Sequence, residues 1–134
     1  MPTTNVPVAQ AGPRVEDVML RAPRTLSPTT TVAEARQAFE NPRERLLLVA
    51  RDETFLGAID REALAGDLPG DATVEALLRD KPRVTTDDSV SHALELLDAD
   101  GGERLPVVAP DGRLVGLVCF NRRQGHFCVD ARGS

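Results

Sequence analysis

Charged side chains at two places could interact with a small anionic ligand. Arg122 and Arg123 stand together shortly after the apolar residues 114–118, and arginine favours planar, bidentate contacts with phosphate or carboxylate groups. Asp60 stands after the apolar residues 55–59, where a carboxylate caps a helix but repels an anion. In the alternative interpretation, the two arginines are solvated surface residues and Asp60 is a plain helix cap.

Cys119, His126 and Cys128 have side chains that could bind a metal or take part in redox chemistry. Structural zinc normally has four ligands and paired cysteine spacings, so these three residues do not favour zinc. A redox pair of Cys119 and Cys128 would need lowered thiol pKa values, for which the sequence gives no sign. We favour a packed C-terminal tail that includes Phe127, Cys128 and Val129.

The sequence lacks the residue patterns of the common enzyme sites. It holds no Ser/His/Asp order, P-loop or Gly-x-Gly-x-x-Gly stretch. His92 lies off the apolar stripe of its predicted helix, and Asp87-Asp88 precede a helix start, where acidic residues are favourable. We therefore expect a protein that is not an enzyme.

The composition excludes several classes of protein. The 134 residues include 21 acidic and 16 basic ones, for a net charge of −5, which weighs against nucleic-acid binding. The longest apolar run, residues 46–50, is too short to cross a membrane. Two cysteines are too few for a secreted disulfide scaffold. Because the first dozen residues also lack the features of a signal peptide, we expect a cytoplasmic protein with a flexible N-terminal tail.

The chain reads as two copies of one unit. A shift of 59 residues places Val15-Glu16 on Val74-Glu75, Pro23-Arg24 on Pro82-Arg83, Glu44-Arg45-Leu46 on Glu103-Arg104-Leu105, and Gly57 on Gly116. Such internal repetition predicts one supersecondary unit that occurs twice. The predicted limits are a tail at 1–13, a repeat at 14–66, a linker at 67–73, a repeat at 74–125 and a tail at 126–134.

Each repeat has a β-α-β-β-α pattern. Short strands are predicted at 25–26 and 84–85, and helices follow the N-cap residues Thr31 and Ser89, the first with a capping box. Hairpins are predicted from 46–50 with 55–59 and from 105–109 with 114–118. Short helices are predicted from Asp60 to Gly66 and from Cys119 to Gly125.

This pattern predicts a mixed α/β (α+β) fold. One repeat alone leaves an open apolar sheet face, which a second copy related by a pseudo-twofold axis would cover. We also expect a homodimer, because parts of the Val32/Phe39 and Val90/Leu97 helix stripes should be left for a second chain.

The tandem pattern resembles the cystathionine β-synthase (CBS) domain pair, or Bateman module. Residues 105–108, Leu-Pro-Val-Val, and residues 116–118, Gly-Leu-Val, carry the resemblance best, and it extends over about residues 15–123. It implies a regulatory module that needs no cofactor, forms disc-shaped dimers, and binds a ligand such as AMP, ADP or ATP in clefts between the repeats. The regulated protein partner is not indicated.

The nucleotide signature of this family is Gly-apolar-apolar-Thr/Ser-x-x-Asp, and both copies depart from it. In the first copy Asp60 replaces the hydroxyl residue and Ala63 replaces the aspartate. In the second copy Cys119 and Arg122 stand at these two positions. A dimerising interaction module whose nucleotide sites are both lost is therefore the alternative function.

The resemblance and the repeat pattern together give two sets of candidate ligand-binding residues. The first site has Thr25, Leu26, Leu46, Ile59 and Asp60, and the second has Arg83, Val84, Thr85, Leu105, Pro106, Val118, Cys119 and Arg122. Of the two, we expect the second to bind phosphate better, because Arg122 would attract it and Asp60 would repel it.

Overall fold

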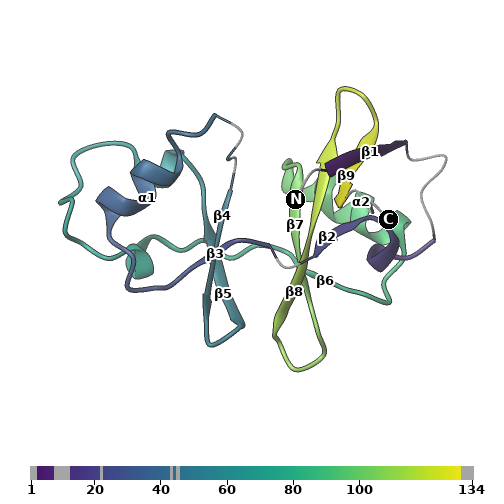
Figure 1. The fold of residues 1–134 in the computed structure, drawn as a ribbon, viewed down its shortest axis with the longest axis horizontal. Helices are drawn as coiled ribbons and strands as arrows, with labels where there is room; N and C mark the ends of the chain where they lie inside the picture. Colours follow the sequence, from purple (N-terminus) through teal and green to yellow (C-terminus); the bar gives the residue numbers. More distant parts are fainter. Residues whose placement is uncertain (1–2, 8–12, 22, 43, 45, 131–134) are drawn as a thin grey trace. The chain divides into compact units, whose positions relative to one another are not determined.

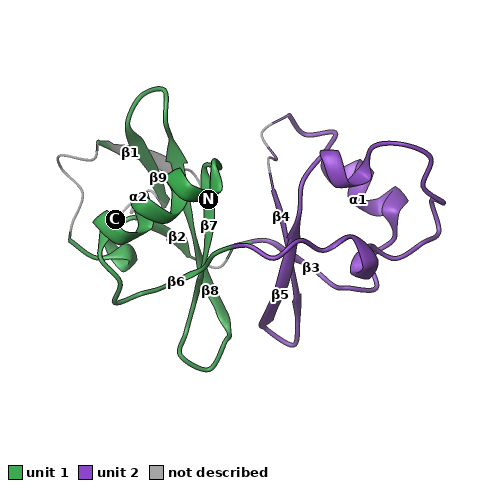
Figure 2. Cartoon of the chain, turned by 180° about the vertical axis from the view of Figure 1, so that it is seen from behind, with its two compact units in different colours: residues 1–23, 82–134 green, residues 24–81 purple. Residues whose placement is uncertain are grey.

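The computed structural model describes residues 3–7, 13–21, 23–42, 44 and 46–130 (Figure 1). The chain divides into two compact units, which Figure 2 colours separately. Residues 24–81 form the continuous unit, and residues 1–23 with 82–134 form the discontinuous unit. Both combine a β-sheet with one α-helix, so the predicted mixed α+β fold is confirmed.

The continuous unit holds a three-stranded sheet in the order β3-β4-β5. Its strands are β3 (Thr25–Leu26), β4 (Leu47–Arg51) and β5 (Thr54–Ile59), and its helices are α1 (Val32–Ala38) and the 3-10 helices η3 (Glu62–Leu64) and η4 (Val74–Leu77). β3 runs parallel to β4, and β5 returns antiparallel to it. The strands, α1 and η3 lie where the repeat pattern predicts them, whereas η4 was not predicted.

The discontinuous unit holds a larger sheet in the order β1-β9-β8-β7-β6, with β2 also paired to β8. Its elements are β1 (Thr3–Pro7), η2 (Val15–Asp17), β2 (Met19–Arg21), β6 (Val84–Thr85), α2 (Val90–Asp100), β7 (Arg104–Val108), β8 (Leu114–Asn121) and β9 (His126–Asp130). β6 is parallel to β7, and the remaining pairs are antiparallel.

Both α-helices begin at the predicted N-cap residues. The Thr31 hydroxyl accepts the Glu34 amide at 3.2 Å, while the Glu34 carboxylate accepts the Thr31 amide at 3.0 Å. In α2 the Ser89 hydroxyl accepts the His92 amide at 3.0 Å. These bonds satisfy amides that have no partner within the helix, so the capping box and the Ser89 cap are confirmed.

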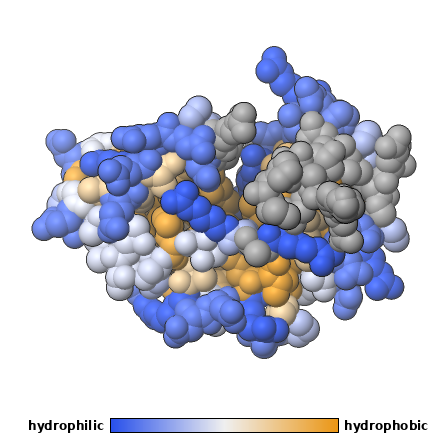
Figure 3. All heavy atoms as spheres, in the orientation of Figure 1, coloured by the Kyte–Doolittle hydropathy of each residue, from blue (hydrophilic) through white to orange (hydrophobic). Residues whose placement is uncertain are grey.

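Each helix packs its apolar stripe into its own unit. Val32 and Phe39 are 0% and 6% exposed in the core of the continuous unit, and Val90 and Leu97 are 8% and 0% exposed in that of the discontinuous unit. Hydrophilic residues cover the region around α1 in the space-filling view (Figure 3). The expectation that these stripes stay open for a second chain is therefore wrong, because each unit uses them for its own core.

The leading segment of each repeat packs with the helix of the other repeat. The Val15 amide donates to the Asp88 carbonyl at 2.8 Å, beside the start of α2. The Val74 amide donates to the Thr30 carbonyl at 2.9 Å, beside the start of α1. The compact units therefore combine segments that are not consecutive in the sequence, and the 59-residue repetition alone does not reveal this exchange.

Both ends of the described chain differ from the sequence-based expectation. β1 pairs with β9 from Thr3 to Pro7, so this part of the predicted flexible tail is a strand, while residues 8–12 lie outside the described residues. The short helix predicted from Cys119 is also wrong, because residues up to Asn121 continue β8 and pair with β9. At the first place a strand pairs with a segment far away in the sequence, and at the second a hairpin with the next strand replaces the predicted helix.

Replacing Gly116 by alanine is expected to destabilise the discontinuous unit by about 1–3 kcal/mol. A Cβ atom there would lie 2.6 Å from the Met19 sulfur and 3.0 Å from the Leu20 carbonyl oxygen, so β2 would have to move away from β8. Gly70→Ala is the matched control, since its Cβ would meet Ala33 at an ordinary 3.6 Å. Urea unfolding of both variants checks this; equal stabilities would contradict the packing of β2.

Candidate functional site

The predicted first site forms one end of the sheet in the continuous unit. Thr25 pairs with Leu48, and Ile59 pairs with Leu47, so the start of β3 and the end of β5 flank the start of β4 at the same end of the sheet. Asp60 directly follows β5 at this end. Four of the five predicted residues gather here: Thr25, Leu46, Ile59 and Asp60.

The two carboxylate oxygens of Asp60 accept hydrogen bonds from different partners. Oδ1 accepts the Ala63 amide at 2.9 Å and so caps the turn that leads into η3. Oδ2 accepts a hydrogen bond from the Arg79 guanidinium at 2.6 Å. Burial raises the pKa of Asp60, but the bonds from Arg79 and the Ala63 amide and the attraction to Arg79 outweigh it. The pKa therefore lies below its usual value, and Asp60 is ionised at neutral pH.

Arg79 is positioned by its backbone as well as by Asp60. Its amide donates to the Ala58 carbonyl at 2.9 Å, and its carbonyl accepts the Ala58 amide at 3.0 Å, next to β5. Sequence analysis missed this residue, because the pairing joins segments about 20 residues apart and leaves no local pattern. Since the guanidinium balances the Asp60 charge, Asp60 does not present an unpaired negative charge to a phosphate.

A pocket of about 380 Å³ opens beside this ion pair. Its lining residues are Pro42, Asp60, Arg61, Glu62 and Arg79. The volume lies within the range of small-molecule sites, about 300–1,000 Å³. The Arg61 guanidinium donates to the Phe39 carbonyl at 2.6 Å and stacks over the Phe39 ring at 4.9 Å. Arg61 therefore holds a fixed positive charge at the wall of the pocket.

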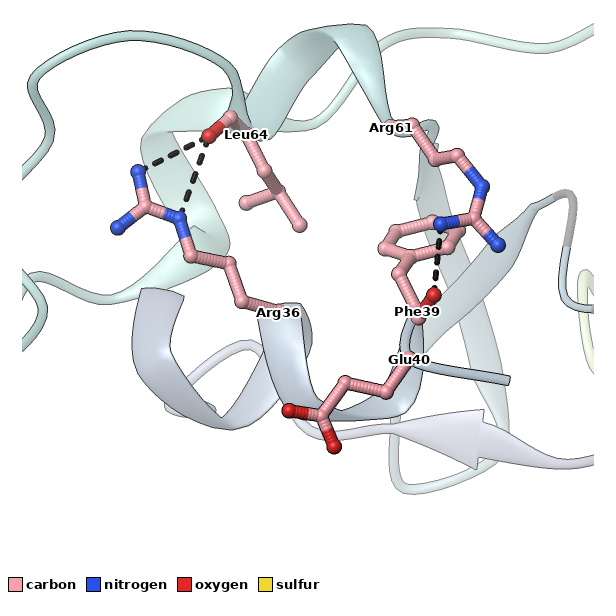
Figure 4. A pocket seen from close by; sticks show the side chains of 5 residues that line it. All are labelled: Arg36, Phe39, Glu40, Arg61 and Leu64. Carbon is pink, nitrogen blue, oxygen red and sulfur yellow. Dashed lines mark hydrogen bonds between the residues drawn. The ribbon is translucent and has the colours of Figure 1, made fainter. Parts of the chain in front are cut away.

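Two further pockets lie in the same unit. One of about 240 Å³ is lined by Arg36, Phe39, Glu40, Arg61 and Leu64, with Arg36 bound to the Leu64 carbonyl (Figure 4). The other, of about 490 Å³, includes Leu26 together with Arg24 and Thr30. Leu26 and Asp60 thus line different pockets, although both were predicted for one site.

Several residues predicted for the second site pack in the core of the discontinuous unit. Val84, Leu105 and Val118 are between 0% and 1% exposed, so their side chains stabilise the unit. The sheet register places Val84 opposite Val107 and Leu105 opposite Val118. Pro106 is buried, Thr85 is half-buried and Arg83 is exposed.

Arg122 makes several contacts with the end of α2. Its guanidinium donates to the Leu97 carbonyl at 2.6 Å, to the Gly102 carbonyl at 2.8 Å and to the Asp98 carboxylate at 2.7 Å. It lies in the turn after β8 and not in the first turn of a helix. These contacts satisfy carbonyls at the helix end. Because the guanidinium already binds groups of the protein, Arg122 is a weaker candidate for binding phosphate than the sequence indicated.

Arg122→Ala is therefore expected to lower the free energy of unfolding by about 1–3 kcal/mol, because charge-assisted bonds to α2 are lost. The neighbouring Arg123→Ala is the control, because Arg123 is exposed in the same turn. Thermal or urea unfolding measures the difference. A fully stable Arg122→Ala variant would show that these contacts do not support the end of α2.

Cys119 and Cys128 lie on neighbouring strands of the discontinuous unit. Cys119 is 5% exposed in β8 opposite Arg104, and Cys128 is half-buried in β9. Phe127 is fully buried, so the predicted packing of the C-terminal segment is confirmed for the described residues.

Within the described part of the chain, no helix has both the length and the apolar character to span a membrane.

Comparisons with known proteins agree on the family. The CBS domain family model matches residues 15–70 and 74–120. Inosine-5'-monophosphate dehydrogenase of Thermoplasma acidophilum is 28% identical over 105 residues, which are 78% of this chain but only 22% of that enzyme. The chain therefore spans about a fifth of the length of this curated relative.

Solved structures show the same fold. A CBS domain pair/ACT domain protein from Thermotoga maritima superposes with a TM-score of 0.71 at 26% identity, covering 79% of this chain and 88% of that one. CBSX2 in complex with AMP also gives 0.71, at 24% identity over 85% and 93% of the two chains. Because the family model covers both repeats, the chain belongs to the CBS domain family, of which it holds a tandem pair.

Proposed function

We propose that this chain is a regulatory module that binds an adenine nucleotide. The single observation that carries the proposal is the Asp60–Arg79 ion pair at the wall of the pocket of about 380 Å³. The Arg79 side chain is 50% exposed, so it can contact a ligand while the less exposed Asp60 holds it in place.

Two of the residues that line the pocket, Arg61 and Arg79, carry the positive charge that a phosphate needs, against the negative charge of Glu62. Arg79 would form the direct contact, since guanidinium and phosphate groups make strong, bidentate hydrogen bonds. Arg61 adds a second positive charge, because the carbonyl groups that accept its hydrogen bonds are neutral and do not cancel it. Thr25 and Leu46 at the same end of the sheet would contact the rest of the nucleotide. We therefore favour the first site over the second, which reverses the order expected from the sequence.

The relatives support this class of ligand. CBSX2 binds AMP, and it shares the fold of this chain. The similarity to inosine-5'-monophosphate dehydrogenase is confined to about a fifth of that enzyme, so it supports a shared part and not a shared reaction. Ligand binding would favour one conformation of the module, and a protein partner would respond to the change in population.

A test is mass spectrometry of small molecules released from the purified, natively folded chain. We expect a purine nucleotide in amounts that approach one per chain. Recovery of none, together with no thermal stabilisation by millimolar AMP, ADP or ATP, would contradict the proposal. That result would favour the alternative, an interaction module without a ligand.

The homodimer remains a prediction. The helix stripes no longer support it, because they are buried within each unit, but closed twofold dimers are common among small proteins. Light scattering after size exclusion would give twice the mass of the chain for a dimer.

A further inference from the structure

The two cysteines face one another across the β8–β9 hairpin. The register pairs Asn121 with His126 and Phe120 with Phe127, and one further step places Cys119 opposite Cys128. A hydrogen bond joins the two thiols, and neither takes part in a disulfide. Directly opposed residues of antiparallel strands have Cα atoms about 4.5–5.5 Å apart, which lies within the range that a disulfide spans, about 4.4–6.8 Å.

The surroundings of the pair distinguish the two sulfurs. Cys128 is the more exposed thiol, whereas Cys119 is 5% exposed. The hydrogen bond from Cys119 and the positive charge of Arg104 lower the pKa of Cys128 to about 7. Burial and the negative charge of Glu103 act in the opposite direction but do not outweigh them. The same hydrogen bond and burial raise the pKa of Cys119. Cys128 is therefore the more readily ionised of the two thiols, and Cys119 is the one held in the protonated form.

We propose that Cys119 and Cys128 form a peroxide-oxidisable dithiol, in which Cys128 is the attacking thiolate and Cys119 the resolving thiol. This proposal is independent of nucleotide binding, because it rests on the hairpin and on Arg104.

The reaction with hydrogen peroxide balances in two steps. The Cys128 thiolate attacks one peroxide oxygen, an S–O bond forms, the O–O bond breaks, and the departing hydroxide takes up a proton to become water. The Cys119 sulfur then attacks the sulfenic sulfur, the S–S bond forms, and the hydroxyl group leaves with the Cys119 proton as a second water. Two thiols and one peroxide thus give one disulfide and two waters.

The first step prepares the second. The largest cause of the raised pKa of Cys119 is its hydrogen bond to the Cys128 sulfur. Oxidation of Cys128 removes the thiolate that accepts this bond, and Arg104 continues to favour a thiolate at Cys119. The largest cause that raises the pKa of Cys119 is therefore lost when Cys128 is oxidised.

Peptide mapping of the full chain tests the proposal. Trypsin cuts after Arg113, Arg122 and Arg123, so Cys119 and Cys128 fall in separate peptides, residues 114–122 and 124–132. After treatment with hydrogen peroxide and digestion without reductant, we expect these two peptides linked, with a mass two hydrogens below their sum. The link should join two cysteines of one chain, which therefore runs as a monomer on a denaturing gel, and dithiothreitol should release it. A link found only between two chains, or sulfenic acid that appears first on Cys119, would overturn the proposal.

Single variants separate the two roles. Cys119→Ala should leave Cys128 as a sulfenic acid that dimedone traps, and should raise the pH midpoint of Cys128 alkylation by more than one unit. Cys128→Ala should leave Cys119 at least tenfold less reactive than Cys128 is in the native chain. Arg104→Gln retains both thiols and should also raise the midpoint, so it serves if Cys119→Ala does not fold. An unchanged alkylation midpoint in a folded Cys119→Ala variant would overturn the assignment.

Discussion

Phe127→Ala is expected to lower the free energy of unfolding by about 3–5 kcal/mol. Phe127 is fully buried in the core of the discontinuous unit, and its ring centroid lies 4.9 Å from that of Phe120. Truncation removes the largest fully buried side chain and leaves a cavity that β8 and β9 can only partly close. The loss is a large share of the about 5–15 kcal/mol that stabilises a typical domain.

Urea unfolding of the variant and of a control measures this effect. Gln124→Ala is the control, because Gln124 is exposed in the turn between β8 and β9. A Phe127→Ala chain as stable as the control would show that β9 does not belong to the core. This outcome would also remove the strand pairing on which the Cys119–Cys128 proposal rests.

The sequence predicts the parts of the fold that local patterns determine. The Thr31 and Ser89 caps and the two hairpins follow from residue types a few positions apart, and the structure confirms them. The extension of β8 through Asn121 could not be predicted in this way, because its partners in β9 lie in a segment taken for a tail. Pairing of β1 with β9 joins opposite ends of the chain and leaves no local signal.

Arg79→Ala is expected to weaken binding of AMP by about 10- to 100-fold. A charge-assisted hydrogen bond contributes about 1.5–3 kcal/mol, and each 1.4 kcal/mol is a factor of ten in affinity. The substitution also leaves Asp60 without its guanidinium partner, so that its negative charge faces the ligand. Both effects act in the same direction. Isothermal titration calorimetry measures the change.

Arg51→Ala is the matched control. Arg51 forms an exposed ion pair with Glu75 at 3.2 Å, at the end of β4 opposite to the proposed site. Both variants lose one arginine from the same unit, so any general effect of net charge is common to them. If Arg51→Ala weakens binding as much as Arg79→Ala, the pocket beside Asp60 is not the ligand site.

The candidate site shows the same division between what the sequence reveals and what it does not. Gly57 and the following apolar residues place Asp60 at the end of a strand, and this is visible in the sequence. The role of Arg79 depends on its backbone pairing with Ala58, and that of Arg122 on the position of the end of α2. Charges that face one another only after folding are the reason why we propose the first site and not the second.

Calorimetric titration of the reduced 134-residue chain with AMP tests the central claim most directly. We expect saturable binding at about one site per chain, which disappears or weakens by at least tenfold in Arg79→Ala while Arg51→Ala binds like the native chain. Two equal sites per chain, or native affinity in Arg79→Ala, would contradict the assignment of the site. No binding heat at several temperatures, with the chain folded and no co-purified nucleotide, would contradict nucleotide binding itself.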